Sequence, residues 1–325
     1  MFNLLFSLGL ILSGLTLGYL IQQLDRCGAL KLPFPLEEVR KFLQKIGLFF
    51  FMSISFLGAV WVIRIGDMRI ITLPALCVLA LLLGGVLALF AARVMRLGRR
   101  QTGAYYACGS FTNIGSVGAL VVFIFLGEQA FALVPLYKLF EEMTYYAIGF
   151  PITKFYSSER GKKERLGSRL KKVFTDAFVL VALGALTVGG VLNLTGIERP
   201  PFFGAVTSLF VPVGTFILLV SIGMAMRISS INKYLTQGMV IAAIKFVAIP
   251  AVIGSLAYML GFGKIEGGLP LKVVLILSSM PVAFTALVPP SLYDLDIDLA
   301  NACWFTTTVG LLAILPWLYF LISFI

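Results

Sequence analysis

The sequence predicts an all-α polytopic membrane protein with ten transmembrane helices, because of its composition, its long apolar stretches and its charge distribution. Of the 325 residues, 59% are hydrophobic and 13% are charged, and the mean hydropathy is +1.00. Soluble domains have about 25% charged and 45–50% apolar residues, so this composition excludes a water-soluble fold. The short loops between ten such helices leave no room for an extramembrane domain.

Each of the ten stretches is near the length of about 20 apolar residues that a bilayer-spanning helix needs. No basic residues precede the first stretch and no small-residue cleavage site follows it, so we expect it to remain as the first helix. The expected spans are 3–22, 43–63, 70–92, 104–126, 130–153, 173–194, 203–226, 238–262, 270–292 and 300–325.

Lys and Arg are concentrated in alternate loops. The loops after the first, third, fifth and seventh spans hold 19 of them, and the loops on the opposite side hold five. The positive-inside rule therefore predicts a protein of the inner or plasma membrane with both termini outside. The net charge of +11 is then an orientation signal. Its expected contacts are anionic lipid headgroups and not nucleic acid.

The basic segment 157–172 divides the chain into two halves, 1–156 and 173–325, with five spans each. Because five is odd, the second half must enter the membrane from the opposite side. Two such units related by an in-plane pseudo-twofold axis are typical of secondary transporters. We therefore expect two inverted five-helix repeats joined by a cytoplasmic linker.

Spans four and nine contain residues that interrupt helices at mid-membrane depth. Glycines recur in span four and prolines in span nine, and both weaken or break helices. Irregular backbone at this depth survives only where protein or a water-filled cavity satisfies it, and paired broken helices point to a transport site. Close packing of small residues would explain either span alone. The expected hydrogen-bonding and backbone positions are Ser110, Thr112, Asn113, Gly115, Ser279 and Thr285.

Several short motifs resemble the auxin efflux carrier family of membrane transporters, whose plant members include the PIN-type auxin exporters. The resemblance implies ten helices in two domains, with the fourth and ninth spans crossing at unwound midpoints, and export or uptake of organic anions such as auxin or small dicarboxylates. It also implies that Asn113 contacts substrate and that Pro281 is the crossover proline. The motifs are Asn113-Ile-Gly115-Ser-Val-Gly118, Phe125-Leu-Gly127-Glu128, Ser278-Ser279-Met-Pro281, Asp296-Ile-Asp298-Leu-Ala300-Asn301, Thr306-Thr-Thr308 and Leu315-Pro316.

Four charged residues lie well inside expected spans, where charge is costly and functional by default. Lys138 reaches Glu141 and Glu142 at i+3 and i+4, so a self-neutralised structural cluster is one interpretation. One lysine cannot neutralise two carboxylates. Lys245 either completes the neutralisation or meets an anionic substrate, and a buried carboxyl would suit proton coupling. These alternatives remain open.

We therefore predict a secondary active transporter, an exporter or an ion-coupled carrier, for a small organic anion such as a carboxylate or an auxin-like compound. The chain has no histidine, no CxxC pair among Cys27, Cys77, Cys108 and Cys303, and no GxxxxGK[ST] motif. An enzyme, a metal site and ATP hydrolysis are therefore not expected, and H⁺ or Na⁺ would supply coupling. A bile-acid-type sodium symporter and a non-transporting receptor or scaffold are the alternatives, and a homodimer is compatible with the sequence.

Overall fold

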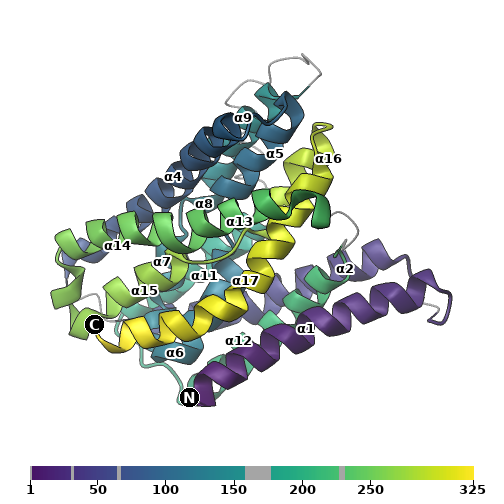
Figure 1. The fold of residues 1–325 in the computed structure, drawn as a ribbon. Coiled ribbons are helices and arrows are strands. Elements are labelled where there is room, and N and C mark those ends of the chain that lie inside the picture. Colours follow the sequence, from purple (N-terminus) through teal and green to yellow (C-terminus); the bar gives the residue numbers. More distant parts are fainter. Residues whose placement is uncertain (1, 31–32, 64–66, 158–176, 227–230) are drawn as a thin grey trace. The chain divides into compact units, whose positions relative to one another are not determined.

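The computed structural model describes residues 2–30, 33–63, 67–157, 177–226 and 231–325, and these residues form helices joined by turns and loops (Figure 1). The described residues contain no strand, only one isolated β-bridge. The all-helical, membrane-protein character predicted from the sequence is confirmed. The predicted linker 157–172 lies outside the described residues except for Ser157, and so do the first four residues of the sixth predicted span.

Seven helices among the described residues are long and apolar enough to cross a membrane. The remaining predicted spans are divided into shorter helices, as in spans five and nine, or fall partly outside the described residues, as in span six. Ten spans and an inverted repeat therefore remain predictions. The seven are Phe2–Arg26, Leu36–Trp61, Met68–Val94, Ile114–Phe131, Phe202–Gly223, Asn232–Met259 and Ile297–Ser323.

The chain forms two compact units, and each unit takes segments from both halves of the sequence. The first unit comprises Met1–Ile65, Ala119–Pro135 and Ala177–Met226, and the second comprises Gly66–Gly118, Leu136–Asp176 and Arg227–Ile325. The short helix α7 (Leu133–Tyr137) crosses this boundary.

The first unit is held together by close helix pairs. Helix α1 packs on α12, and α3 packs on α11. Gly18 of α1 and Gly223 of α12 allow the backbones to touch, since a Cβ on Gly18 would lie 2.0 Å from the Val220 carbonyl oxygen. Small residues that permit such approach are typical of membrane helix pairs. The helices are α1 (Phe2–Arg26), α2 (Leu36–Lys45), α3 (Ser53–Trp61), α6 (Ala119–Phe131), α11 (Ala177–Leu194) and α12 (Phe202–Gly223).

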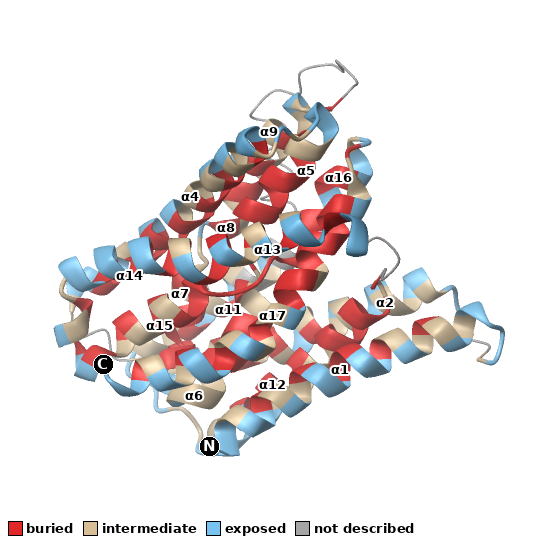
Figure 2. Ribbon diagram, viewed as in Figure 1, coloured by how far each residue is buried: buried red, intermediate tan, exposed pale blue. Residues whose placement is uncertain are grey.

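The second unit encloses α5 and the beginning of α17. Helix α5 is buried on all sides from Gly103 to Ser110, whereas α4 and α14 also have exposed residues (Figure 2). Helix α4 packs on α5, and α13 packs on α17. The helices are α4 (Leu73–Val94), α5 (Arg99–Ser110), α8 (Glu141–Thr144), α9 (Phe150–Phe155), α13 (Leu235–Ala243), α14 (Ile249–Met259), α15 (Leu269–Ser278), α16 (Val288–Leu292) and α17 (Ile297–Ser323).

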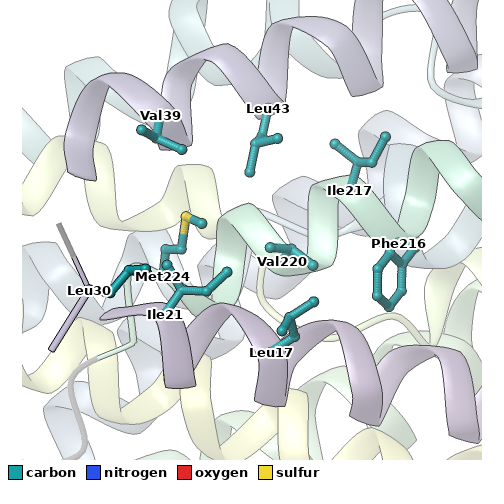
Figure 3. A pocket seen from close by; sticks show the side chains of 9 residues that line it. All are labelled: Leu17, Ile21, Leu30, Val39, Leu43, Phe216, Ile217, Val220 and Met224. Atoms are coloured by element: carbon teal, nitrogen blue, oxygen red, sulfur yellow. The ribbon is translucent and has the colours of Figure 1, made fainter. Parts of the chain in front are cut away.

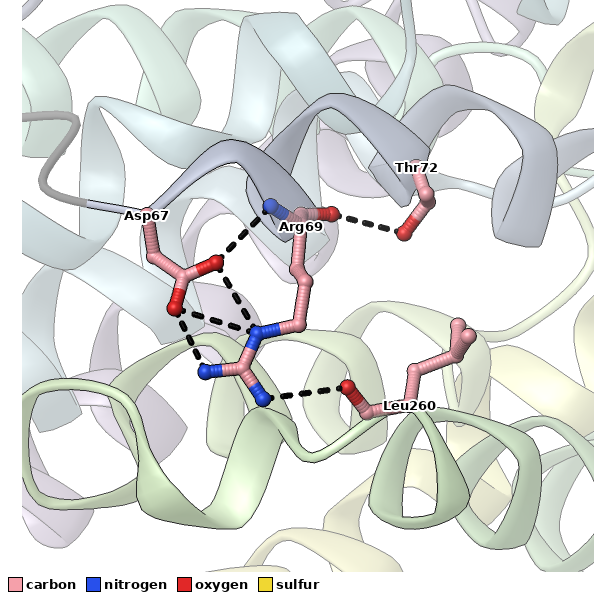
Figure 4. A network of polar contacts seen from close by, with 4 residues as sticks. All are labelled: Asp67, Arg69, Thr72 and Leu260. Atoms are coloured by element: carbon pink, nitrogen blue, oxygen red, sulfur yellow. Dashed lines mark hydrogen bonds and ion pairs between the residues drawn. The ribbon is translucent and has the colours of Figure 1, made fainter.

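A polar network fixes the start of α4 in the second unit (Figure 4). The Asp67 carboxylate accepts bonds from the Arg69 backbone N–H at 2.9 Å and from the Arg69 Nε at 2.9 Å. The Arg69 guanidinium also donates to the Leu260 carbonyl at the end of α14, at 3.5 Å. The hydrogen bonds from the Arg69 side chain and backbone lower the pKa of Asp67 to about 2.

Two acids near the start of α17 have structural roles. Asp296 caps the helix by accepting a hydrogen bond from the Leu299 N–H at 2.9 Å. Asp294 forms an ion pair with Arg100 at 2.6 Å. Cys77, Cys108 and Cys303 are buried free thiols, as expected of small apolar residues, and Cys27 is exposed.

Candidate functional site

The predicted interruptions of spans four and nine are present in the second unit. Helix α5 ends at Ser110 and helical structure resumes at Ile114. Helix α15 ends at Ser278 and a 3₁₀ turn begins at Phe284. Each span therefore contains a short non-helical segment between two helical pieces.

The two non-helical segments hydrogen-bond to each other. Thr112 and Val282 form an antiparallel β-bridge, the one isolated bridge in the described residues. Because neither segment is helical here, each satisfies backbone groups of the other, as irregular backbone inside a membrane requires. The flanking bonds run from the Ala283 N–H to the Phe111 oxygen at 3.1 Å and from the Asn113 N–H to the Pro281 oxygen at 2.9 Å. We call residues 111–113 and 280–283 the crossing.

Lys245 contacts the crossing from a different helix. It lies in a π-helical turn, Ile244–Ala248, between α13 and α14, and such turns are frequent at functional sites. Its side chain is fully buried, and its ammonium donates to the Thr112 hydroxyl at 2.6 Å. Among the described residues, no carboxylate lies within ion-pair distance of Lys245. The sequence did not decide which group Lys245 contacts. In the structure its ammonium contacts Thr112.

Lys138, Glu141 and Glu142 form a separate charged cluster. Lys138, in the turn before α8, pairs with Glu141, the first residue of α8, at 3.0 Å, with side chains 22% and 5% exposed. Glu142 is only partly buried. The pairing of Lys138 with Glu141 agrees with the spacing in the sequence. Lys245 does not join this ion pair.

Tyr145 connects the Glu141 carboxylate to the crossing. Its hydroxyl lies 2.9 Å from Glu141 Oε1 and 3.2 Å from the Thr112 carbonyl oxygen, and it accepts a bond from the Thr112 N–H at 3.0 Å. Its ring stacks on Phe111 at a centroid distance of 4.0 Å. The sequence analysis missed Tyr145, although its position four residues after Glu141 places both on one helix face.

The Asn113 side chain caps the second helical piece of span four. Its Oδ1 accepts bonds from the Ser116 hydroxyl at 2.5 Å and from the Val117 N–H at 3.4 Å. Asn113 is partly exposed, and its amide nitrogen has no hydrogen-bond partner in the described part of the chain. That nitrogen is therefore a donor at the crossing.

The other predicted positions differ in what they offer a ligand. The Ser279 hydroxyl is buried and donates to the Leu275 carbonyl of its own helix at 2.7 Å, the packing alternative raised for such residues. Ser110 is buried and Thr285 is exposed. A Cβ on Gly115 would lie 2.7 Å from the Lys138 ammonium, so glycine leaves room for that side chain.

Thr307 is a second residue at the crossing to which the sequence analysis assigned no site role. Its hydroxyl oxygen lies 3.2 Å from the Val282 N–H and accepts that bond. The same hydroxyl can donate to the Cys303 carbonyl oxygen of α17, 3.0 Å away. The one signal for Thr307 in the sequence was its position in the threonine run 306–308.

A pocket of about 380 Å³ lies within the first unit and has an entirely apolar lining (Figure 3). None of the predicted site residues lines it. Without a polar group it cannot fix the orientation of a charged ligand, since binding sites combine apolar walls with a few placed polar groups. The lining residues are Leu17, Ile21, Leu30, Val39, Leu43, Phe216, Ile217, Val220 and Met224.

No protein-family model matches the sequence. The chain is 22% identical over 251 residues to an uncharacterized transporter of Methanothermobacter thermautotrophicus, and the match covers 77% of this chain and 78% of that protein. It is 25% identical over 264 residues to an uncharacterized transporter of Methanocaldococcus jannaschii, with 79% and 80% covered. These similarities, together with the apolar helices, support a multi-pass membrane transporter and favour it over an enzyme.

Proposed function

We propose that the protein is a secondary transporter that moves a small organic anion, such as a carboxylate, across the cell membrane by alternating access at the crossing. The observation that carries this proposal is the buried Lys245 ammonium, which is bonded to Thr112 at the crossing. The transporters that the sequence resembles, the auxin efflux carrier family, carry organic anions.

The surroundings of Lys245 favour an anionic ligand. Transfer of an ammonium from water to a buried position costs several kcal/mol unless an opposite charge and hydrogen bonds compensate it. An ammonium has three donors, and Lys245 uses one of them on Thr112. A carboxylate bound there would provide both the counter-charge and a charge-assisted hydrogen bond.

A neutral group of the crossing supplies a further donor. The amide nitrogen of Asn113, which has no partner in the described residues, is the donor that the crossing offers beside Lys245. The expected order of importance is Lys245 first, then Asn113.

Spacing along the sequence supports the inverted repeat on which alternating access depends. The bridged residues 112 and 282 are 170 positions apart. The same separation relates the first residues of α5 and α15, Arg99 and Leu269. It also relates Gly84, which faces α5, to Gly254, which faces α15. Two repeats that meet at an antiparallel bridge would produce this agreement.

Helix packing within the first unit also has the symmetry that two repeats would produce. Helix α1, the first predicted span, packs on α12, the seventh, and α3 of the second span packs on α11, the sixth. Exchange of the two halves converts one pair into the other. We therefore retain the two repeats, 1–156 and 173–325, as part of the proposal.

The proposed orientation places both termini outside the plasma membrane. Lys41 of α2 and Glu198 between α11 and α12 are exposed, and the charge distribution along the sequence predicts them on opposite sides of the membrane. A cysteine that replaces Lys41 should react with an impermeant maleimide only from the cytoplasmic side, and one that replaces Glu198 only from the outside. The opposite labelling pattern contradicts the orientation.

A two-stage experiment tests the proposed function. Purified protein is first screened by thermal shift against mono- and dicarboxylates, with sodium and pH varied. The compound that raises the melting temperature most is then used for counterflow in proteoliposomes. We expect stabilisation by a carboxylate, counterflow of that compound, and a marked weakening of both in Lys245→Met.

The same assay separates the alternatives. Uptake that requires sodium at every pH favours a sodium symporter of the bile-acid type. Binding without counterflow favours a receptor or scaffold. Binding of cations or neutral solutes with equal affinity in Lys245→Met and in the wild-type protein contradicts an anion site at the crossing.

A further inference from the structure

Tyr145 has one hydroxyl hydrogen and two acceptors within reach. The Glu141 carboxylate oxygen is 2.9 Å away and the Thr112 carbonyl oxygen is 3.2 Å away. The hydroxyl oxygen also accepts the Thr112 N–H at 3.0 Å. A tyrosine hydroxyl donates one hydrogen bond at a time, so Glu141 and Thr112 compete for it.

The charge of Glu141 decides this competition. An ionised carboxylate is the stronger acceptor, because charge-assisted hydrogen bonds are about twice as strong as neutral ones. When Glu141 takes up a proton on Oε1, its own O–H can donate to the Tyr145 oxygen. The Tyr145 hydrogen then rotates to the Thr112 carbonyl, without any transfer of a proton between the two residues.

Charged and titratable groups from several elements surround Glu141. Lys138 forms its ion pair, while Glu142 on the next position adds negative charge near Lys138. From neighbouring elements, Cys77 of α4, Tyr137 of α7 and Lys245 lie within electrostatic range of Glu141. Glu141 Oε2 accepts no hydrogen bond in the described structure and is held by the ion pair alone.

We propose that Tyr145 is a positioning residue that transmits the protonation of Glu141 to the unwound backbone of span four. With Glu141 ionised, Tyr145 holds Thr112 only through its N–H. With Glu141 protonated, Tyr145 holds both the N–H and the carbonyl of Thr112. Protonation thereby tightens the crossing, and its loss loosens the segment that also carries Asn113. As a means of coupling protons to transport, this proposal deepens the proposed function and rests on it. The change of hydrogen-bond acceptor at Tyr145 itself requires no substrate.

Amide hydrogen–deuterium exchange of substrate-free protein in nanodiscs tests whether the Tyr145 hydroxyl changes its hydrogen-bond acceptor. The readout is the protection of backbone amides in peptides that cover residues 111–118, corrected for the intrinsic pH dependence of exchange. Glu141→Gln mimics the protonated carboxyl. In the wild-type background it should raise this protection about fivefold, the factor that corresponds to a net hydrogen bond of about 1 kcal/mol. In the Tyr145→Phe background it should change nothing.

Tyr105→Phe is the matched control. Tyr105 is also fully buried in the second unit, and its hydroxyl donates to the Gln237 carbonyl at 3.0 Å. Loss of either hydroxyl removes a buried hydrogen bond, and Tyr145→Phe also leaves the Thr112 N–H without its acceptor. Tyr145→Phe should therefore lose at least as much thermal stability as Tyr105→Phe. Only Tyr145→Phe should abolish the effect of Glu141→Gln, which the double-mutant cycle measures directly.

A pH series gives a second measurement that does not depend on any Glu141 variant. Corrected protection of residues 111–118 should rise as pH falls in the wild-type protein and in Tyr105→Phe, and should stay flat in Tyr145→Phe. An equal effect of Glu141→Gln in the presence and absence of the Tyr145 hydroxyl overturns the proposal. So does a lack of any effect in the wild-type background. Because no substrate is present, failure of the anion-transport proposal would leave this result intact.

Discussion

Replacement of Lys245 by methionine should weaken anion binding without loss of stability. The substitution deletes one hydrogen bond of a charged group, the 2.6 Å contact with Thr112, which contributes about 1.5–3 kcal/mol. It also removes a fully buried charge whose desolvation costs several kcal/mol. Methionine has a similar length and fills the space. We therefore expect an unfolding free energy within about 1 kcal/mol of the wild-type value, or above it.

Lys138→Met is the matched control, because Lys138 is a partly buried lysine with a carboxylate partner. Its removal leaves Glu141, whose side chain is 5% exposed, without its ion-pair partner. Such a break costs 3–5 kcal/mol when both groups are fully buried, and about 2–3 kcal/mol here because the Lys138 side chain is 22% exposed. Lys138→Met should therefore lower the free energy of unfolding clearly more than Lys245→Met does.

Thermal melting in detergent or nanodiscs, with carboxylate titrations on each variant, provides the assay. Lys245→Met should melt near the wild-type temperature and bind the selected carboxylate roughly 10- to 100-fold more weakly, the loss of one charged hydrogen bond. A strong fall in melting temperature with unchanged affinity would refute the reasoning. Lys245 would then be a structural residue of the crossing.

Three further predictions follow from contacts in the second unit. Asn113→Ala should cost about 0.6 kcal/mol of stability, typical of a neutral bond in a bilayer, and should weaken carboxylate binding tenfold or more, measured by thermal-shift titration. Gly84→Val should overpack the interior and lower the free energy of unfolding by about 1–3 kcal/mol, and with it the melting temperature, because a Cβ there would meet a backbone oxygen at 2.2 Å. Gly9→Val should leave the melting temperature unchanged, since nothing lies within 4 Å of a Cβ at that position. The lowered pKa of Asp67 means that its hydrogen bonds with Arg69 stabilise the fold above about pH 4 and that this contribution is lost as pH falls towards 2; Asp67→Asn should flatten melting temperature against pH in that window.

Comparison of the crossing with its sequence shows why the interruptions could be predicted. Glycine and proline alter the backbone of their own helix, so their effect is local and can be read from the sequence. The break after Ser110 and the break after Ser278 were both expected, and both are present. The pairing of Lys138 with Glu141 was also local, because the two residues are three positions apart in the sequence.

The partners of Thr112 could not be predicted in the same way. Lys245 is 133 residues away in the sequence, and Tyr145 is 33 residues away. Whether Lys245 neutralises Glu141 or faces the crossing depends on which helices pack together, and both arrangements satisfy the same composition. Likewise, Ser279 and Thr285 are both hydroxyl residues of span nine, but one donates to its own helix and the other is exposed.

The sequence by itself determined that the chain is a helical membrane protein, because the bilayer acts on every apolar residue and every backbone hydrogen bond independently of the tertiary fold. It also determined where two helices must break. Only the tertiary structure decided that the breaks bridge each other at Thr112 and Val282, that Lys245 lies at this bridge, and that each compact unit combines both halves of the chain. These features depend on side-chain packing between distant segments, which hydrophobicity and helix propensity along one chain do not encode.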